Sequence, residues 1–459
     1  MGHDCSFLSA LDVSSSFDSD ARDRHSADFG TEAIGERSTP DAVVRPKTTA
    51  EVATILEAAT DHGVPVTPYA AGTSLEGNPV PTEGGISMNM MAMDDVLAIR
   101  PDDLQIDVQP GVIGSRINEV AAEHGCYFPP MPAANDIATI GGMIANDASG
   151  MTTVQYGEVH DWILELEVVL ADGTVLTAGS KASKTSSGYN LKSLFVGSEG
   201  TLGVITRATL ELTTEPTQKR GGRAIFPSLE LASTAVTAAV QAGIDVATLE
   251  LIDSLSAEIA NAHVGAGLAD NPMVFFECHG VAGKHAIEQL KTIFEENQAN
   301  SISLASEDER MSELWAARRE LAVAMQVYDP TLRPLHPGDV TVPISHYPDI
   351  IADAKSLGEK YELLVPCFGH AGDGNVHYTV FVDPDDERMV ERGEALYREI
   401  VEHAIEYGGT ATGEHGIGIG KRPFLRTEHE AEGVETMRRL KRALDPTNTL
   451  NPGKIFPDD

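Results

Sequence analysis

Two glycine-rich segments late in the chain carry residues that could bind a metal. His370 and His377 lie in the segment Gly-His-Ala-Gly-Asp-Gly-Asn-Val-His, which apolar residues flank on both sides. A hairpin-like bend there would bring the two imidazoles together. Glu414 and His415 lie in the segment Thr-Gly-Glu-His-Gly-Ile-Gly. Two imidazoles and one carboxylate form an open catalytic site for zinc, or for a harder ion such as manganese. The sequence predicts that His370, His377 and Glu414 bind a divalent metal.

If Glu414 is a ligand, its neighbour His415 is left to act as a base. An imidazole titrates near neutral pH, and a bound metal makes a substrate hydroxyl easier to deprotonate. Any one of these histidines could instead be an ordinary core or loop histidine. The glycines that crowd both segments favour a site, because glycine is needed where backbone must approach a ligand closely.

A substrate that carries an acid group would need a cation to hold it. Arg318 and Arg319 stand in the segment Glu-Leu-Trp-Ala-Ala-Arg-Arg-Glu, where helical spacing puts neighbours on different faces. One guanidinium can therefore point inward and bind a carboxylate while the other meets solvent. Most arginines on helices are simply solvated, so the pair alone does not decide between the two roles.

Three loops rich in glycine and small residues could cradle phosphates. They cover residues 68–78, 139–150 and 197–205. Glycine permits close approach and unusual dihedral angles, so that successive backbone N–H groups can face a pyrophosphate. Three such loops suit a long dinucleotide that lies extended across a domain. No G-x-G-x-x-G follows a strand, and Gly-Ile-Gly-Ile-Gly-Lys-Arg at 416–422 is not a P-loop, so NAD and ATP are not expected as cofactors.

The elements that must hold these loops are predicted to form a mixed sheet with helices. Val52, Ile55, Leu56 and Ala59 recur at helical spacing and predict a helix over residues 49–62. Short apolar runs bounded by Asp-Gly and other glycine-rich turns predict strands. These strands cover residues 43–44, 64–67, 106–108, 163–170, 174–177 and 204–212.

A change of composition at residues 213–222, towards Thr, Glu, Pro, Lys and Arg, predicts a domain linker. Beyond it, helices are expected over residues 228–243 and 285–297, between short strands such as 273–278. This alternation is typical of a second domain of the α+β type.

The composition fits a large globular protein. The chain has 459 residues, of which 42% are hydrophobic, and it is too long for one small core. It has no apolar run long enough to span a membrane, and its start lacks the pattern of a signal peptide, so a cytoplasmic protein without a transmembrane segment is expected. The four cysteines, at positions 5, 126, 278 and 367, form no C-x-x-C pair, which argues against an iron–sulfur cluster and against a disulfide framework.

The charge excludes some partners. Asp and Glu number 70 against 33 for Lys and Arg, which gives a formal net charge of -37. A chain this acidic is not expected to bind nucleic acid or an anionic membrane surface. The acidic residues are spread along the whole chain. A cytoplasm rich in salt would screen their mutual repulsion, so we expect a halophilic host. An ordinary acidic protein is the alternative.

Taken together, these motifs resemble those of the FAD-linked oxidases with the vanillyl-alcohol oxidase (PCMH-type) fold. The resemblance is strongest to the branch of D-lactate dehydrogenase, the glycolate oxidase flavin subunit and D-2-hydroxyglutarate dehydrogenase, and it spans Thr39 to Pro457. The segments that carry it are residues 71–77, 188–191, 195–203, 369–377, 413–418 and 450–454.

The resemblance implies an α+β protein built from several parts. It implies a PCMH-type FAD-binding domain at 36–215, a substrate or cap domain at 216–410, and a C-terminal segment at 411–459 that returns to the flavin. Residues 1–35 form an extension that we expect to be partly mobile. In similar enzymes the first glycine-rich loop holds the FAD pyrophosphate, and other segments line the rest of the cofactor. The residues that match these FAD contacts are Ala71, Gly72, Thr73, Ser74, Leu75, Gly77, Asn78, Thr139, Ile140, Gly141, Gly142, Ser149, Gly150, Glu199, Ile205 and Asn451.

The resemblance also implies a reaction. His370, His377 and Glu414 match the metal ligands, His415 the base, and Arg318 the arginine that binds the substrate carboxylate. In the implied reaction His415 takes the hydroxyl proton of a D-2-hydroxy acid, and the α-hydrogen passes as hydride to flavin N5, which leaves a 2-oxo acid. The electrons would leave to a quinone, an electron-transfer protein or an iron–sulfur partner, and the enzyme could be a homodimer.

The sequence before Asp339 favours a substrate with one acid group. The 2-hydroxyglutarate enzymes carry a lysine there to bind the second carboxylate, whereas Leu-His-Pro-Gly stands at 335–338 here. Oxidation of D-lactate to pyruvate is expected because residues 73–77 look closest to the lactate dehydrogenases. Glycolate and D-2-hydroxyglutarate are the alternatives. Two rivals come from other classes: a flavin-dependent non-redox alkyl transferase, which would not need the metal triad, and a non-catalytic electron-relay subunit.

Overall fold

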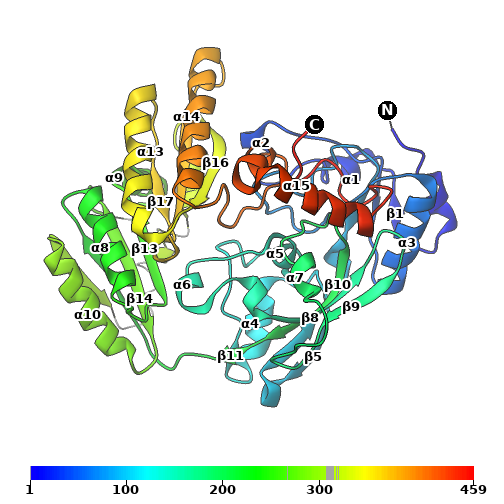
Figure 1. Ribbon diagram of the computed structural model, residues 1–459, viewed down its shortest axis with the longest axis horizontal. Coiled ribbons are helices and arrows are strands. Elements are labelled where there is room, and N and C mark those ends of the chain that lie inside the picture. Colours follow the sequence, from blue (N-terminus) through cyan, green and yellow to red (C-terminus); the bar gives the residue numbers. More distant parts are fainter. Residues whose placement is uncertain (1, 266, 306–314, 317, 319, 459) are drawn as a thin grey trace. The chain divides into compact units, whose positions relative to one another are not determined.

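The computed structural model of the protein describes residues 2–265, 267–305, 315–316, 318 and 320–458 (Figure 1). The chain divides into two compact units. The first contains Met1–Ser149, Glu158–Glu215 and Glu414–Asp459, and the second contains Gly150–Gly157 and Pro216–Gly413. In the described parts of the chain, none of the helices combines the length and apolar character that crossing a bilayer requires. The four cysteines are buried and have free thiols.

A small sheet of the first unit carries the start of the first glycine-rich loop. Its strands, in spatial order, are β1 (Ser15–Ser16), β2 (Ala42–Val44), β4 (Ile86–Asn89) and β3 (Val66–Tyr69). β2 and β3 both run parallel to β4, so the chain needs a crossover between them, and α3 (Thr49–His62) provides it. The hydroxyl of Thr48 caps this helix and Gly63 ends it with a φ of 63°. The predicted helix at 49–62 is therefore confirmed.

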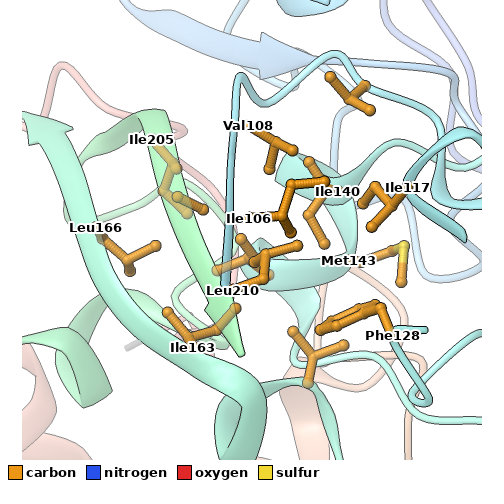
Figure 2. Close-up of a cluster of buried hydrophobic side chains, with 14 of the residues drawn as sticks. Ile106, Val108, Ile117, Phe128, Ile140, Met143, Ile163, Leu166, Ile205 and Leu210 are labelled. Atoms are coloured by element: carbon orange, nitrogen blue, oxygen red, sulfur yellow. The ribbon is translucent and has the colours of Figure 1, made fainter. Parts of the chain in front are cut away.

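A second sheet of the first unit is antiparallel throughout. Its strands, in spatial order, are β5 (Val96–Arg100), β6 (Gln105–Val108), β10 (Val204–Glu211), β8 (Ile163–Val169) and β9 (Val175–Gly179). Its buried face packs against α4 (Gly114–Ala122) and α5 (Ile140–Asn146). Figure 2 shows this core, in which Ile106 and Leu210 of the sheet meet Ile140 and Met143 of α5. The packing fixes α5, and with it the second glycine-rich loop.

The first unit also contains short elements and a C-terminal helical segment that is kinked at Glu430. They are α1 (Ser19–Asp23), α2 (Thr31–Ile34), β7 (Cys126–Tyr127), α7 (Lys192–Phe195), β11 (Thr213–Thr214) and α15 (Leu425–Leu444). The N-terminal extension, for which the sequence predicts partial mobility, is packed in the structure. Leu8 is fully buried and Cys5 nearly so, in one apolar cluster with residues of α3 and β4.

The second unit is built on one antiparallel sheet of seven strands. In spatial order they are β15 (Ser301–Ala305), β12 (Lys219–Ile225), β14 (Met273–His279), β13 (Thr248–Ile252), β17 (Cys367–Gly369), β18 (Asn375–Val382) and β16 (Arg333–Thr341). Its helices are α6 (Thr153–Tyr156), α8 (Leu229–Gln241), α9 (Ser254–Val264), α10 (Gly283–Glu296), α12 (Leu321–Gln326), α13 (Tyr347–Tyr361) and α14 (Glu387–Glu406). α8 packs against α10 and α13, and α13 packs against α14. α8 and α10 confirm the two helices predicted for this region.

The linker predicted at 213–222 is shorter than expected. β11 pairs with β7, and β12 begins at Lys219, so only residues 215–218 lie between these strands. Gly222, within the predicted linker, has a packing role in β12. A Cβ on Gly222 would lie 2.3 Å from the carbonyl oxygen of Ser303 on the neighbouring strand. Glycine is needed there for the strands to approach, which the composition of the segment does not reveal.

Candidate active site

His370 and His377 stand on either side of a tight turn in the second unit. β17 and β18 pair antiparallel, with Phe368 opposite His377. A single 3-10 turn, Ala371–Asp373, joins the strands and ends at Gly374, whose φ is 78°. A Cβ on Gly374 would lie 2.1 Å from the carbonyl oxygen of Val342, so only glycine fits. The predicted hairpin-like bend is present, and the two imidazole rings meet edge to face with their centroids 5.1 Å apart.

A carboxylate lies behind each imidazole. Nδ1 of His370 donates to Oε1 of Glu250 over 2.6 Å, and Nδ1 of His377 lies 3.6 Å from Oδ1 of Asp339. Both carboxylates are fully buried. Metal-binding histidines commonly have a carboxylate at the second ring nitrogen, which orients the ring and raises its basicity. The two histidines therefore fit a divalent metal, which His370 would coordinate through Nε2.

Arg318 is buried, unlike most arginines on helices. It is 5% exposed, its Nε donates to Oε2 of Glu250 over 2.7 Å, and its guanidinium lies 4.9 Å from the ring centre of Phe368. Its Nη2 is buried and has no hydrogen-bond partner among the described residues. Of the two arginines that the sequence singles out, Arg318 points inward; Arg319 lies outside the described residues.

Sequence reasoning missed Glu250, which connects the two groups just described. Its carboxylate joins His370 through one oxygen and Arg318 through the other. Glu250 lies in β13 between Leu249 and Leu251, whose side chains point to the opposite face of the sheet. An isolated acid inside a fully buried strand was the available signal, because such a residue needs cationic partners.

The segment that carries Arg318 is held by a second carboxylate. Nε1 of Trp315 donates to Oε2 of Glu277 over 2.8 Å, and the other oxygen of Glu277 lies 2.6 Å from Nε2 of His279. Nδ1 of His279 is 2.7 Å from the hydroxyl of Tyr156. Glu277 thus anchors Trp315, three residues before Arg318. This network could not be predicted from the sequence either.

The first glycine-rich loop, after β3 in the first unit, offers unpaired backbone donors. Within the described part of the chain, the N–H groups of residues 72–75 have no hydrogen-bond partner. Gly72 has a φ of 69°, a conformation that glycine adopts without strain. Consecutive unpaired N–H groups in a half-buried loop form a concavity for an anion. The loop therefore fits the pyrophosphate of FAD.

Glu199 and Asn451 tie three distant segments of the first unit together. The carboxylate of Glu199 accepts hydrogen bonds from Nδ2 of Asn78 and from the backbone N–H groups of Ile417 and Gly418, over 2.7 to 2.9 Å. Nδ2 of Asn451 donates to the carbonyl oxygens of Asn78 and Glu199. Burial raises the pKa of Glu199, and these hydrogen bonds oppose the rise. The Glu199 carboxylate is thus engaged within the protein.

His415 sits among buried polar groups of the first unit. Its carbonyl oxygen accepts from Nδ2 of Asn146 over 3.2 Å and from Nδ2 of Asn78 over 3.5 Å. Its Nδ1 lies 3.7 Å from Oε1 of Glu76, which is also 3.6 Å from Nζ of Lys421. Glu76 and Lys421 are fully buried, and neither was among the residues predicted for the site. Their only signal was their position inside the glycine-rich segments.

The other predicted residues are distributed over both units. Glu414 accepts from the hydroxyl of Ser149 over 2.7 Å in the first unit. Thr139 caps α5 by accepting from the N–H of Gly142, while Ile140 and Ile205 are buried in the core of Figure 2. The remaining ones are Gly141, which backs onto Pro110, and Gly150, which belongs to the second unit and donates to Thr153. Glu414 and His415 thus belong to the first unit, and His370, His377 and Arg318 to the second.

Comparison with known families assigns the chain to a class of flavoproteins. The domain described as "FAD linked oxidases, C-terminal domain" matches residues 215–455, and the domain described as "FAD binding domain" matches residues 40–179. The chain belongs to the FAD linked oxidases.

Individual relatives are similar over most of their length. The chain is 37% identical over 427 residues to the glycolate oxidase subunit GlcD of Bacillus subtilis (strain 168), covering 92% of this chain and 90% of that one. It is also 37% identical over 441 residues to the probable mitochondrial D-lactate dehydrogenase of Danio rerio, covering 95% and 87%. The mitochondrial D-lactate dehydrogenase [cytochrome] of Arabidopsis thaliana is 36% identical over 420 residues, covering 91% and 74%.

Solved structures confirm the predicted PCMH-type fold. The 4-ethylphenol oxidase from Gulosibacter chungangensis matches 97% of this chain and 94% of its own, with a TM-score of 0.77 and 19% identity. p-Cresol methylhydroxylase covers the same shares with a TM-score of 0.75 and 16% identity. An alkyldihydroxyacetonephosphate synthase has a TM-score of 0.74 and 18% identity, covering 95% and 82%. At these identities the similarity establishes the fold and no activity.

Proposed function

We propose that this FAD-linked oxidase oxidises a D-2-hydroxy acid, with D-lactate as substrate and pyruvate as product. The observation that carries the proposal is the buried arrangement of Arg318, Glu250 and His370. One carboxylate holds an inward guanidinium and a histidine of the predicted metal site in the same network. Such an arrangement suits a small substrate that presents a carboxylate and an adjacent hydroxyl.

Arg318 is proposed to bind the substrate carboxylate. Its Nε is engaged by Glu250, and its Nη2 is a buried donor without a partner among the described residues. An unpaired buried donor costs about 1–3 kcal/mol, which a ligand oxygen would offset. Glu250 fixes the orientation of the guanidinium, so that the carboxylate of the substrate would be held in one direction.

The metal is proposed to bind to His370, His377 and Glu414, with zinc or manganese as the ion. The carboxylates behind both imidazoles support this assignment. A bound metal would lower the pKa of the substrate hydroxyl.

His415 is proposed to take the proton of the substrate hydroxyl. Glu76, 3.7 Å from Nδ1, would stabilise the imidazolium that forms, and the hydrogen bonds to the carbonyl oxygen of His415 would hold its backbone in place. FAD, when bound, supplies the acceptor for the α-hydrogen. The electrons are proposed to leave to a quinone, an electron-transfer protein or an iron–sulfur partner rather than to NAD.

The strand that contains Asp339 favours a substrate with a single acid group. Residues 335–338 of β16 contain no lysine or arginine. The one titratable side chain among them, His336, lies 3.1 Å from the carboxylate of Glu394. Residues 335–338 therefore offer no lysine or arginine for a second carboxylate. Relatives named for D-lactate and for glycolate leave these two acids as the candidates, and D-lactate is proposed.

The proposal is tested by anaerobic reduction of the bound flavin. The purified protein, in high salt, is mixed separately with D-lactate, L-lactate, glycolate and D-2-hydroxyglutarate, and the oxidised-flavin absorbance near ~450 nm is followed. Rapid bleaching by D-lactate alone is expected. Bleaching by glycolate alone would show that glycolate, and not D-lactate, is the substrate. If none of the acids bleaches the flavin although dithionite still reduces it, the proposal is wrong. A flavin-dependent non-redox alkyl transferase or a non-catalytic electron-relay subunit would then be the better assignment.

A further inference from the structure

The N-terminal extension contacts the loop proposed to bind the pyrophosphate. The backbone N–H of Phe29 donates to the carbonyl oxygen of Gly72 over 2.9 Å, and the N–H of Gly30 donates to that of Ser74 over 3.1 Å. The hydroxyl of Tyr69, at the start of the loop, donates to the carbonyl oxygen of Ala27 over 3.1 Å. Residues 27–30 therefore hold one side of this loop by its backbone, within the first unit.

These contacts decide where the unpaired donors of the loop point. In a trans peptide the C=O and the N–H of one peptide unit point in opposite directions. Because the carbonyls of Gly72 and Ser74 face Phe29 and Gly30, the N–H groups of Thr73 and Leu75 face away from the N-terminal extension. Both N–H groups are among those that have no partner in the described part of the chain. The extension thus turns two unpaired donors away from itself.

Asp28 uses its carboxylate to hold the same loop. Oδ2 accepts from the hydroxyl of Ser74 over 3.0 Å and from the N–H of Gly77 over 2.9 Å, and Oδ1 accepts from the hydroxyl of Thr31 over 2.8 Å. Ser74 and Gly77 were predicted to contact FAD, but these two donors already have an anionic partner. Two of these three bonds tie the partly buried carboxylate to the loop, and the bond from Thr31 holds the carboxylate in the extension.

Gly30 allows the close approach that these bonds require. A Cβ on this residue would lie 1.9 Å from the carbonyl oxygen of Leu75 and 2.6 Å from its Cα. The φ of Gly30 is -84°, which any residue adopts, so its backbone conformation does not demand glycine. Glycine is required at this position only because of the close contact with Leu75 of the loop. Replacing Gly30 with alanine would therefore displace the loop without straining the extension itself.

We propose that residues 28–30 position the loop for FAD, with Asp28 and Gly30 as positioning residues that aim the N–H groups of Thr73 and Leu75 at the pyrophosphate. The proposal rests on the assignment of residues 72–78 to the cofactor. It gives the N-terminal extension a role in cofactor affinity, although the extension itself need not touch the cofactor.

The test compares Asp28→Ala and Gly30→Ala with the wild type and with the control Asp23→Asn. Asp23 lies in the same extension but pairs with Arg37 at the surface, and its side chain is 67% exposed. The full-length proteins are freed of FAD, and its rebinding is titrated by flavin fluorescence. We expect FAD affinity to fall about tenfold or more in both variants and to stay unchanged in the control. Asp28→Ala loses the two charge-assisted hydrogen bonds to the loop, whereas the new Cβ of Gly30→Ala displaces the loop.

Amide hydrogen exchange of the FAD-free proteins provides a second readout. Faster exchange at Gly77 in Asp28→Ala, with unchanged exchange in α3, is expected because that N–H loses its acceptor. Asp28→Asn replaces Asp28→Ala if the latter does not fold. Tight FAD binding by the wild type and equally by both variants would overturn the role of the extension. A wild type that bound no FAD would instead overturn the proposed function.

Discussion

Glu250 and His370 form a buried carboxylate–imidazole pair, with Oε1 of Glu250 2.6 Å from Nδ1 of His370. The other oxygen of the same carboxylate is 2.7 Å from Nε of Arg318. Glu250 has no exposed surface, so neither contact competes with water. A single acid therefore positions both the histidine proposed to bind the metal and the arginine proposed to bind the substrate.

Glu250→Gln is expected to weaken metal binding about 10- to 100-fold, the range typical of residues that support a ligand. The amide replaces one of the two carboxylate oxygens with an NH2 group, so either His370 or Arg318 would face a donor in place of its acceptor. The measurement is metal content after dialysis against graded chelator. Glu394→Gln is the matched control, because Glu394 also pairs with a histidine but is half exposed. Equal metal retention in the two variants would contradict the role of Glu250.

Arg318→Lys is expected to raise the KM for D-lactate about tenfold or more while FAD stays bound. Lysine keeps the charge but lacks the planar fork that engages Glu250 through Nε and presents a second donor through Nη2. Steady-state kinetics with an artificial electron acceptor measure the effect. Arg392→Lys, which alters an exposed pair with Glu362, should leave KM unchanged. An unaltered KM in Arg318→Lys would remove the arginine from substrate binding.

His415→Ala is expected to keep FAD and to reduce flavin reduction by substrate about 100- to 10,000-fold, the usual contribution of a general base. The side chain contacts Glu76, whereas the backbone contacts with Asn146 and Asn78 use the carbonyl oxygen and survive the change. Stopped-flow absorbance under anaerobic conditions gives the rate, and dithionite reduction shows that the flavin is intact. Substantial remaining reduction by D-lactate would exclude His415 as the base.

Local patterns were predictable where a short segment determines its own structure. The helix at 49–62 carries its cap, its apolar stripe and its terminal glycine within one segment. The turn between His370 and His377 likewise depends on the glycines inside it. Periodicity and turn chemistry act over a few residues, so the sequence alone was sufficient for both.

Residues that depend on tertiary contacts were not predictable. Glu250 finds Arg318 and His370 across 68 and 120 positions of the chain. Asp28 meets Gly77 from 49 positions away. Such a partner leaves no spacing pattern in the sequence. The only indication was an acid in an apolar strand, or an acid in an extension that was expected to be partly mobile.

The stability of the protein is expected to rise steeply with salt. A net charge of -37 repels itself in the folded state, and salt screens that repulsion over about 10 Å at 0.1 M ionic strength. Thermal unfolding is measured across a range of KCl concentrations, with sucrose as a control that is excluded from the surface but does not screen charge. A protein that remains folded and active for days in dilute buffer would contradict the halophilic assignment.

Glu158 is expected to make the protein less stable as the pH rises. Burial and the carboxylates of Asp147, Asp161 and Glu414 raise the pKa of Glu158 to about 7, from an ordinary value of 4.5. The folded protein keeps this proton up to about pH 7, whereas the unfolded chain releases it near pH 4.5. The free energy of unfolding therefore falls as the pH rises from about 4.5 to about 7, and the contribution of Glu158 changes no further above that range.

Glu158→Gln removes that cost while its amide oxygen can still accept the hydrogen bond that caps the following turn. The variant should therefore have a higher Tm than the wild type at about pH 8.5, with an advantage that shrinks towards about pH 5.5 as the wild type takes up its proton. Glu119→Gln, which alters an exposed pair with Arg116, is the control and should show no such trend. A difference in Tm that did not change with pH would show that Glu158 ionises normally in the folded protein.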